Sequence, residues 1–437
     1  MIFRNDKTPG IITHLLFLVF LAGLVFSWRA VCSISIMAIL LWGLIATKGR
    51  TGTLFHQRNT KAVLCASFAY FLLQVVAVFY SNDRSSAWSN VQLKTGMLIM
   101  PLAVILCATH LKKTLRLLLW HYSLMILIAA AICLVNAWLT YRTMGNSNVF
   151  FYHELASPLS GHAIYLSILV TVAILFLVES FFSSPALPNR RTAICLVVFL
   201  LLFMMLLSSK LVLIFLFGYL FLVLTRFFHF NHFRRVTVVG SFGILILLIV
   251  LMLGTNNPVS RRFYDVIDGR LSMAWQNNFT PGDYFNGLQF RLLQWKLVPE
   301  ILAERNRWLR GVGTGDAQDA LNDKYLSRHM YAGDPDRGKK GYLAYNTHNQ
   351  FLQTLLQTGI FGLVVLFVLI GCLARIAWNA IDKLPIAYTC LLIVWLFTEA
   401  PLETQYGIIL VSFFPLLLLP ENPLASVKAN LLKRSSD

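Results

Sequence analysis

Long apolar runs separated by short polar connections make up most of this chain. A helix of roughly 17–25 apolar residues is long enough to cross a hydrocarbon core about 30 Å thick. The pattern predicts about twelve such spans, near residues 11–27, 31–47, 62–80, 95–111, 117–139, 162–183, 193–208, 211–225, 236–254, 348–372, 384–399 and 407–420. The first run is closely followed by the second and lacks a small-residue cleavage site, so we interpret it as a span and not as a signal peptide. The chain is therefore predicted to be an all-α polytopic membrane protein.

One long polar stretch, residues 255–347, interrupts this pattern. We expect it to form a water-exposed domain between the ninth and tenth spans. The predicted organisation has nine spans in residues 1–254, the large loop in 255–347, three spans in 348–420 and a short tail in 421–437. A membrane protein with one large polar domain on one side is expected to act at the membrane surface.

The distribution of basic residues predicts the topology. The chain is 57% hydrophobic and 13% charged, with a formal net charge of +18. Most Lys and Arg lie in alternate short connections, which places those connections and both termini in the cytoplasm by the positive-inside rule. The excess charge is therefore topogenic and does not indicate nucleic-acid binding. The large loop falls on the opposite side, where its surplus of Lys and Arg over acidic residues indicates an anionic ligand.

Two helices are predicted inside the large loop. Residues 288–304 predict an amphipathic helix that is kinked or restarted at Pro299. Its apolar face is expected to contain Leu288, Leu292, Trp295 and Val298 or Leu302. Three alternating glycines in residues 311–315 predict a tight turn, and a second helix is expected from about Asp316. Residues 334–338 predict an exposed turn.

Three residues are the main candidates for chemistry. His348 lies where the large loop meets the tenth span, so it could act as a general base or hydrogen-bond donor, or could simply be an interfacial residue satisfied by water. Arg291 could bind phosphate through its planar fork, supported by Trp295 four residues on, or could be a solvated surface residue. Lys210 lies in a very short turn between two apolar spans, where a cation is either functional or snorkels to the interface.

Other polar residues give weaker signals. Asn349 is a natural helix N-cap or a second polar contact. Gly313 lies in a glycine run that lacks the strand and the Gly-Lys-Ser/Thr of a nucleotide-binding loop, although the helix amides after it could face an anion. Glu399 and Glu403 flank the last outer turn and could orient His348 or bind an acceptor. Solvation is the default expectation for polar residues of the outer connections, which include Asp83, Arg84, Lys94, Arg142, His153, Glu154, His162, Glu399, Glu403 and Gln405.

The cysteines and acidic residues give no sign of a metal or a disulfide. All seven cysteines lie in apolar runs, and none lies in the large loop. We therefore expect small buried apolar side chains at these positions, without disulfides. No Cys/His metal spacing and no acidic metal-binding pair is evident, so the sequence predicts neither a metal nor another cofactor.

The start of the tenth span resembles the signature of a known family. His348-Asn349, nine residues and then Gly359-Ile360-Phe361-Gly362 resemble the H-N-x9-G-x-x-G motif of the O-antigen ligase and polymerase superfamily. Arg291 with Trp295 four residues on, followed by the glycine run, resembles that family's large loop. The resemblance implies a GT-C-type membrane glycosyltransferase with about twelve spans and one large, mostly helical periplasmic loop.

The same resemblance implies an activity and roles for residues. The donor would be a glycan on undecaprenyl diphosphate, transferred with inversion and without nucleotide or metal at the periplasmic face of the bacterial inner membrane. His348 would orient or deprotonate the attacking hydroxyl, and Arg291 and Lys210 would stabilise the departing diphosphate, with Lys210 in place of the family's usual arginine. A ligase would use a lipid A-core acceptor. A polymerase would use another lipid-linked repeat, and a third relative glycosylates protein side chains.

Two hypotheses of other classes are weighed against this enzyme. A transporter of lipid-linked sugars should show repeat symmetry and charged or broken helices at mid-bilayer, whereas the predicted spans are nearly free of charge and the polar groups collect on one side. A non-catalytic scaffold would tolerate substitution of His348. Membrane lipids and glycan substrates are the expected partners in the favoured interpretation.

Overall fold

Helices make up most of the structure, a computed structural model that describes residues 8–47, 58–159, 162–182, 189–227, 243, 271–334, 339–380 and 383–419. Within these ranges, eight helices are long and apolar enough to cross a membrane. Three shorter apolar helices cover Lys210–Val223, Leu384–Thr398 and Gln405–Leu417. Together they coincide with the predicted spans except 236–254, which lies outside the described residues apart from residue 243. The prediction of an all-α polytopic membrane protein is confirmed.

The chain divides into two compact units. The first comprises Met1–Ser35 and Lys113–Asp268, and the second comprises Ile36–Lys112 and Gly269–Asp437. Each unit is thus built from two segments that are distant in the sequence. Arg291 and His348 belong to the second unit, and Lys210 belongs to the first.

The first unit is organised around one buried helix. Its elements are α1 (Thr8–Val25), the start of α2 (Arg29–Ala46), α7 (Leu115–Met144), η1 (Ser147–Phe150), α8 (Tyr152–Ala156), α9 (Ala163–Ser180), α10 (Arg190–Leu207) and α11 (Lys210–Phe227). Nearly every residue of α9 is buried. Tyr122 of α7 donates a hydrogen bond to Leu169 O of α9 at 2.7 Å, and Tyr219 of α11 donates to the Glu179 carboxylate at 3.0 Å. Apolar packing with a few polar cross-links therefore holds this unit.

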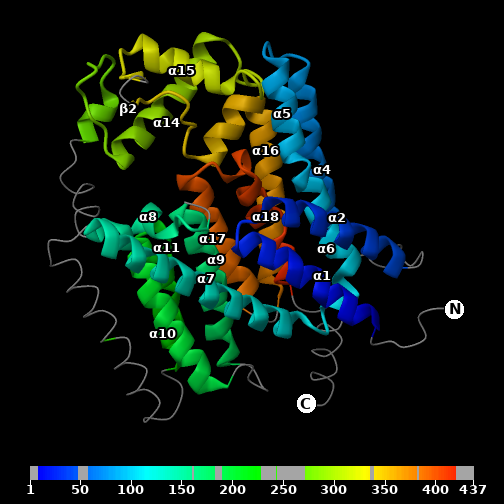
Figure 1. Cartoon of the computed structure of the whole chain (residues 1–437). Helices are drawn as coiled ribbons and strands as arrows, with labels where there is room; N and C mark the ends of the chain where they lie inside the picture. Colours follow the sequence, from blue (N-terminus) through cyan, green and yellow to red (C-terminus); the bar gives the residue numbers. More distant parts are fainter. Residues whose placement is uncertain are drawn as a thin grey trace. The chain divides into compact units, whose positions relative to one another are not determined.

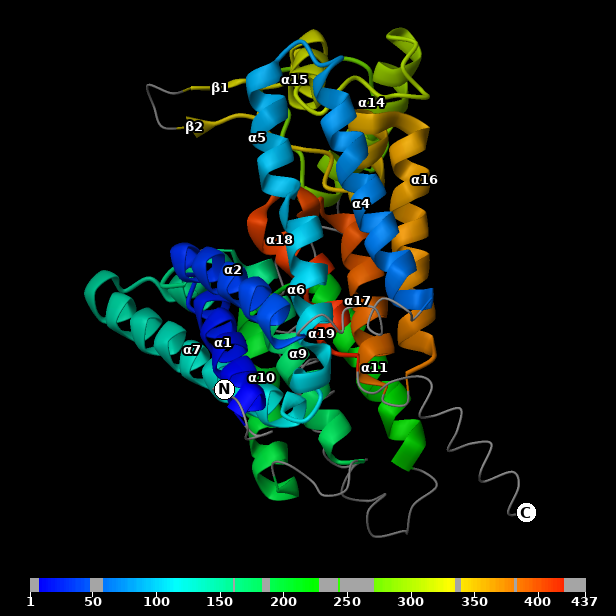
Figure 2. The same cartoon turned by 90° about the vertical axis from the view of Figure 1, so that its right-hand side faces the viewer.

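The second unit combines membrane-type helices with the helices of the large loop. Its elements are the rest of α2, α4 (Arg58–Val78), α5 (Arg84–Lys94), α6 (Gly96–Leu111), η2 (Leu271–Trp275), α14 (Gly287–Glu304), α15 (Ala317–Ser327), β1 (Gly333–Asp334), β2 (Lys339–Lys340), α16 (Gln350–Trp378), α17 (Leu384–Thr398), η4 (Pro401–Glu403), α18 (Gln405–Ser412) and α19 (Phe414–Leu417). The long helices α4 and α16 pack side by side (Figure 2). At the end where α16 begins, α14 and α15 lie across the helix tips (Figure 1). The strands pair Gly333 with Lys340 and Asp334 with Lys339 in antiparallel register, and most of the predicted turn between them lies outside the described residues.

The predicted helices of the large loop are confirmed, but the predicted apolar face of the first is partly wrong. α14 begins with a capping box formed by Asn286 and Gln289 and continues through Pro299 to Glu304. Its buried face consists of Gln289, Phe290, Leu293, Gln294, Leu297, Val298, Ile301 and Leu302. Leu288, Leu292 and Trp295, predicted to be on the apolar face, are only partly buried. Polar Gln289 and Gln294 occupy the buried stripe because their amides have hydrogen-bond partners there, which hydrophobic periodicity alone does not indicate.

A break in α16 connects this helix to the glycine run. Gly359 has φ 67° and ψ −161°, which lies outside the helical region. The carbonyls of Leu356 and Gln357, released by the break, accept hydrogen bonds from Val312 N at 2.8 Å and Gly313 N at 3.1 Å. On the other side of the break, Ile360 N donates to Trp308 O at 2.9 Å. The glycine run therefore completes the backbone hydrogen bonding of a broken membrane-type helix.

Candidate active site

His348 sits on a strained turn immediately before α16. Its φ is +45°, a left-handed conformation that is uncommon for residues other than glycine. Asn349 follows as the N-cap of α16, because its side-chain oxygen accepts from Leu352 N at 3.1 Å and its amide nitrogen donates to Phe397 O at 3.1 Å. The cap predicted for Asn349 is confirmed. Both ends of its amide group are occupied by protein, and together they fix the backbone that carries His348.

The side chains of α14 hold the same turn from the other side. Trp295 donates from its indole nitrogen to Thr347 O at 3.2 Å. Gln294, the residue before it, donates to Asn346 O and to the Tyr325 hydroxyl. The sequence suggested that Trp295 supports Arg291, and the structure shows that it anchors the residue next to His348. Trp295 thereby couples α14 to the turn that carries His348.

A single carboxylate joins His348 to Arg291. Glu399 follows the last residue of α17, and its Oε2 lies 3.0 Å from His348 Nδ1. Its Oε1 accepts from Arg291 Nη2 at 2.7 Å. The exposed side-chain fractions are 23% for His348, 17% for Glu399 and 28% for Arg291, so all three side chains keep access to solvent. The structure thus brings together two predicted catalytic residues through Glu399, for which orienting His348 and binding an acceptor had been the two predicted alternatives.

The environment of Glu399 keeps its carboxylate ionised. Burial by itself raises the pKa of this group, but the hydrogen bond and charge of His348 and the guanidinium of Arg291 outweigh burial. The net result is a pKa below the usual value for glutamate. An ionised Glu399 accepts the hydrogen of His348 Nδ1, and in the neutral form of the imidazole this arrangement leaves Nε2 with its lone pair.

Arg291 is held by three acceptors. Besides Glu399, its Nε donates to Thr398 O at 3.1 Å and its Nη1 donates to Gly287 O at 3.2 Å. A guanidinium has five N–H groups, so these bonds fix the plane of the side chain and leave further donors for an anion. The exposed fraction of 28% shows that the head group is not enclosed.

Glu403, the last residue of η4, has a different environment from Glu399, which lies just before this turn. Its Oε2 accepts from Lys94 Nζ at 3.2 Å and from Gln357 Nε2 at 2.9 Å, and Lys94 also donates to Gln357 Oε1 at 3.3 Å. The Lys94 side chain is fully buried and that of Glu403 is 12% exposed. The default expectation of solvated outer residues is therefore wrong for Lys94 and Glu403, because helices α5 and α16 cover the turn that links the last two spans. Glu399 keeps partial access to solvent, but its carboxylate is engaged by His348 and Arg291.

The polar residues of α16 that reach this buried network follow a pattern that the sequence could have revealed. Gln350 donates to Thr354, whose hydroxyl lies 3.2 Å from the Tyr70 hydroxyl, and Gln350 Oε1 accepts from Leu402 N at 2.8 Å. Gln350, Thr354 and Gln357 recur at helical spacing within a segment predicted to be a membrane span. Such a polar stripe indicates one face of a helix that contacts other polar groups.

The glycine run serves close packing in this structure. A side chain at Gly313 would begin 2.4 Å from Ser81 Oγ, and one at Gly315 would begin 2.1 Å from Asp83 O. Asp316, the next residue, accepts from Asn82 N and Asp83 N, each at 2.8 Å. The run thus fits between the α4–α5 turn and α16. A substrate contact for Gly313 stays a prediction.

Lys210 begins α11 in the first unit. α10 ends at Leu207, and Ser208 has a left-handed φ of 50°, so the very short turn predicted here is confirmed. Its predicted catalytic role beside Arg291 and His348 stays a prediction.

Comparison with known protein families gives one match. Residues 195–367 match the family model described as O-antigen ligase. This stretch covers less than half of the chain but includes Lys210, Arg291 and His348, so the resemblance seen in the sequence is confirmed for that part. A search of curated proteins found no significant match. The chain is thus a multi-pass membrane protein in which residues 195–367 match the O-antigen ligase family model.

Proposed function

We propose that this protein is an O-antigen ligase that transfers a glycan from undecaprenyl diphosphate to a lipid A-core acceptor. The family match supports a membrane enzyme of the ligase or polymerase type. The observation that carries the proposal to individual residues is the Glu399 carboxylate between His348 and Arg291. The ionised Glu399 carboxylate contacts both His348, which can accept a proton, and Arg291, which can bind a phosphate.

His348 is proposed to be the general base. With Glu399 accepting the hydrogen on Nδ1, the Nε2 lone pair can accept the proton of the acceptor hydroxyl. The acceptor oxygen then forms a bond to the anomeric carbon of the donor sugar while the bond from that carbon to the diphosphate oxygen breaks. This displacement inverts the anomeric configuration, and Glu399 stabilises the imidazolium that results.

Arg291 is proposed to hold the diphosphate as negative charge develops on it. Three of its N–H groups are engaged by protein oxygens, which fixes the guanidinium before the substrate arrives. The remaining N–H groups can donate to phosphate oxygens. Lys210 is proposed to supply a second positive charge as a point contact, without the planar fork of arginine.

The topology that accompanies this proposal places both termini in the cytoplasm and the large loop in the periplasm of a bacterial inner membrane. Residues 255–347 then form the periplasmic domain, with spans before and after it. Lipid-linked substrates would reach His348 and Arg291 from the outer leaflet. Asn349, Trp295 and Glu403 are proposed to support the site by fixing the backbone on which His348 and Glu399 are carried.

Gel electrophoresis of surface polysaccharide tests this function. A strain lacking the gene would be complemented with wild type or with His348→Asn, and protein levels would be checked by blotting. A ligase predicts that ladders on lipid A-core disappear in the variant while full-length glycan accumulates on the lipid carrier. A single repeat left on lipid A-core would identify a polymerase, and unchanged ladders would refute the role of His348.

A further inference from the structure

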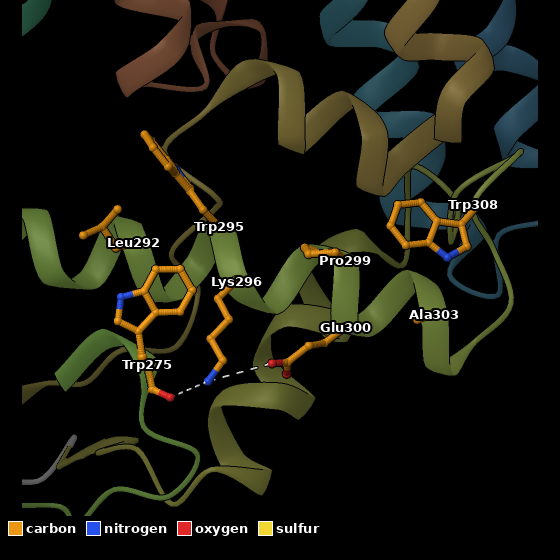
Figure 3. A pocket seen from close by; sticks show the side chains of 8 residues that line it. All are labelled: Trp275, Leu292, Trp295, Lys296, Pro299, Glu300, Ala303 and Trp308. Atoms are coloured by element: carbon orange, nitrogen blue, oxygen red, sulfur yellow. Dashed lines mark hydrogen bonds and ion pairs between the residues drawn. The ribbon is translucent and has the colours of Figure 1, made fainter. Parts of the chain in front are cut away.

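The outer face of α14 carries a groove that none of the roles above uses. Its volume is about 620 Å³. Six of its residues recur at helical spacing along α14, and two tryptophans from flanking segments complete it (Figure 3). The lining residues are Trp275, Leu292, Trp295, Lys296, Pro299, Glu300, Ala303 and Trp308. The opposite face of α14 packs in the core of the large loop. This helix therefore has one apolar face that packs against the loop and a second face that lines the groove.

We propose that this groove binds a run of pyranose rings in the glycan that is being transferred or extended. The proposal rests on the function proposed above and names a binding site for its substrate. Trp275 is 64% exposed and Trp308 is 39% exposed, so both present indole surface to solvent at separate points of the groove. The groove is open, and a lining of aromatic residues with a few polar groups is a feature that it shares with small-molecule sites. The C–H face of a sugar ring stacks on such an indole surface.

The groove is linked to the candidate active site through one residue. Trp295 lines it and also donates its indole hydrogen to Thr347, the residue before His348. From Leu292 to Ala303 the helix rises about 16 Å at 1.5 Å per residue. Linked sugar rings lying along this face would extend away from the turn that carries His348. The groove therefore has the position and the length expected for the part of a glycan that does not react.

The charges in the groove favour an uncharged ligand over a phosphate. Lys296 Nζ donates to Trp275 O at 2.9 Å, Gln276 O at 3.1 Å and Asn277 Oδ1 at 2.8 Å, which uses its three N–H groups. Glu300 is paired with Arg328 at 2.7 Å. An anionic lipid headgroup would therefore meet a carboxylate and a lysine whose donors are already engaged. These contacts argue for sugar rings and against insertion of the tryptophans among lipid headgroups.

Isothermal titration calorimetry on the full-length protein in nanodiscs tests the groove. The probes are O polysaccharide and core oligosaccharide, each released from lipid A of the source bacterium by mild acid. Trp275→Leu and Trp308→Leu keep an apolar side chain but remove the indole face, and Trp88→Leu on α5 replaces an exposed tryptophan outside the groove. We expect the dissociation constant to rise about tenfold in the two groove variants, the loss of roughly one stacking contact, and to stay unchanged in the control.

The outcomes separate the groove from the proposed function. If the groove variants bind O polysaccharide less well, the donor glycan occupies the groove. If they bind core oligosaccharide less well, the acceptor occupies it. In one outcome, the groove variants bind a glycan less well than the wild type does, but the wild type transfers no glycan. This outcome supports the groove proposal and refutes the proposed ligase function. If wild type binds neither glycan, or if both groove variants bind as wild type does, the groove proposal is refuted. Lower thermal stability of the groove variants only in anionic nanodiscs, with unchanged glycan binding, would show a membrane-facing role instead and also refute it.

Discussion

Two clusters, each built around a glutamate, lie at the two ends of the short turn after α17 and differ in their burial. Glu399 joins His348 and Arg291, and all three side chains are partly exposed. Glu403 joins Lys94 and Gln357, and the lysine is fully buried. The turn between them is also tied to α16, because Leu402 N donates to Gln350. We infer that the buried cluster positions the turn and that the exposed cluster performs the chemistry.

The comparison teaches how a membrane protein places a charged site at the end of a span. A buried ion pair is costly to form, but removing one partner is more costly because it leaves an uncompensated charge. The Lys94–Glu403 pair therefore fixes one position of the turn. Glu399, held at the same turn, can then keep a constant distance to His348 while remaining open to substrate.

The largest expected effect concerns the base. His348→Asn should lower transfer by about 10²–10⁴-fold, the usual contribution of a general base. Asparagine tolerates the left-handed backbone of His348, so the fold should be kept. His329→Asn is a matched control, since His329 also has a positive φ, at 60°. Glycan transfer to lipid A-core measures the effect, and equal activity of the two variants would contradict the proposed role.

The second effect concerns stability. Lys94→Met should destabilise the protein by about 3–5 kcal/mol, because it leaves Glu403 buried without its cation. Adding Glu403→Gln should recover much of the loss, since the remaining polar groups are neutral. The apparent melting temperature in detergent measures both variants. If Lys94→Met alone were as stable as the wild type, the buried pair would not hold the turn.

A smaller effect is expected from pH. The pKa of Glu399 is lowered in the folded protein, so its contribution to stability is complete above the ordinary glutamate pKa of about 4.3. The contribution is lost as pH falls through the lower, folded-state pKa. Glu399→Gln should therefore show a shallower decrease in melting temperature below about pH 4.3 than wild type does. Parallel pH profiles would show that the contacts with His348 and Arg291 do not stabilise the carboxylate.

The smallest effect is expected from Trp295→Phe. The variant loses the hydrogen bond to Thr347 O but keeps an aromatic ring in the groove. A typical hydrogen bond contributes about 0.5–1.5 kcal/mol, so transfer should fall roughly two- to tenfold. Steady-state kinetics should show the loss in kcat, because His348 is less well positioned. A change confined to KM would indicate that Trp295 acts through the groove alone.

Much of the fold could be predicted from the sequence, because apolar runs and helix caps are local signals. The apolar spans within the described residues, the helices of the large loop and the Asn349 cap are confirmed. The prediction of buried cysteines is wrong for Cys65, Cys195 and Cys390, which lie exposed on the apolar helices α4, α10 and α17. The buried face of α14 was partly mispredicted, because polar Gln289 and Gln294 occupy it while Leu292 and Trp295 do not. Periodicity alone does not indicate which polar groups will find partners.

The site could be predicted only in part, because its geometry depends on contacts between distant segments. His348 and Arg291 were found from their residue types and their resemblance to a family. Orientation of His348 by Glu399 was one of two predicted alternatives, but the contact of the same carboxylate with Arg291 was not predicted. That contact requires α14 and the end of α17 to meet at the turn before α16. The burial of Lys94 depends in the same way on α16 and η4 covering α5. The polar stripe of Gln350, Thr354 and Gln357 is the sequence signal that would have indicated it.

The central claim is that Glu399 acts in the reaction while Glu403 only supports the fold. The most direct measurement compares Glu399→Gln with Glu403→Gln for rate of glycan transfer and for apparent melting temperature in the same preparation. The account predicts that Glu399→Gln lowers the transfer rate at least about tenfold and lowers the melting temperature less than Glu403→Gln does. Glu403→Gln should lower mainly the melting temperature. Equal losses of both quantities in the two variants, or full transfer by Glu399→Gln, would contradict it.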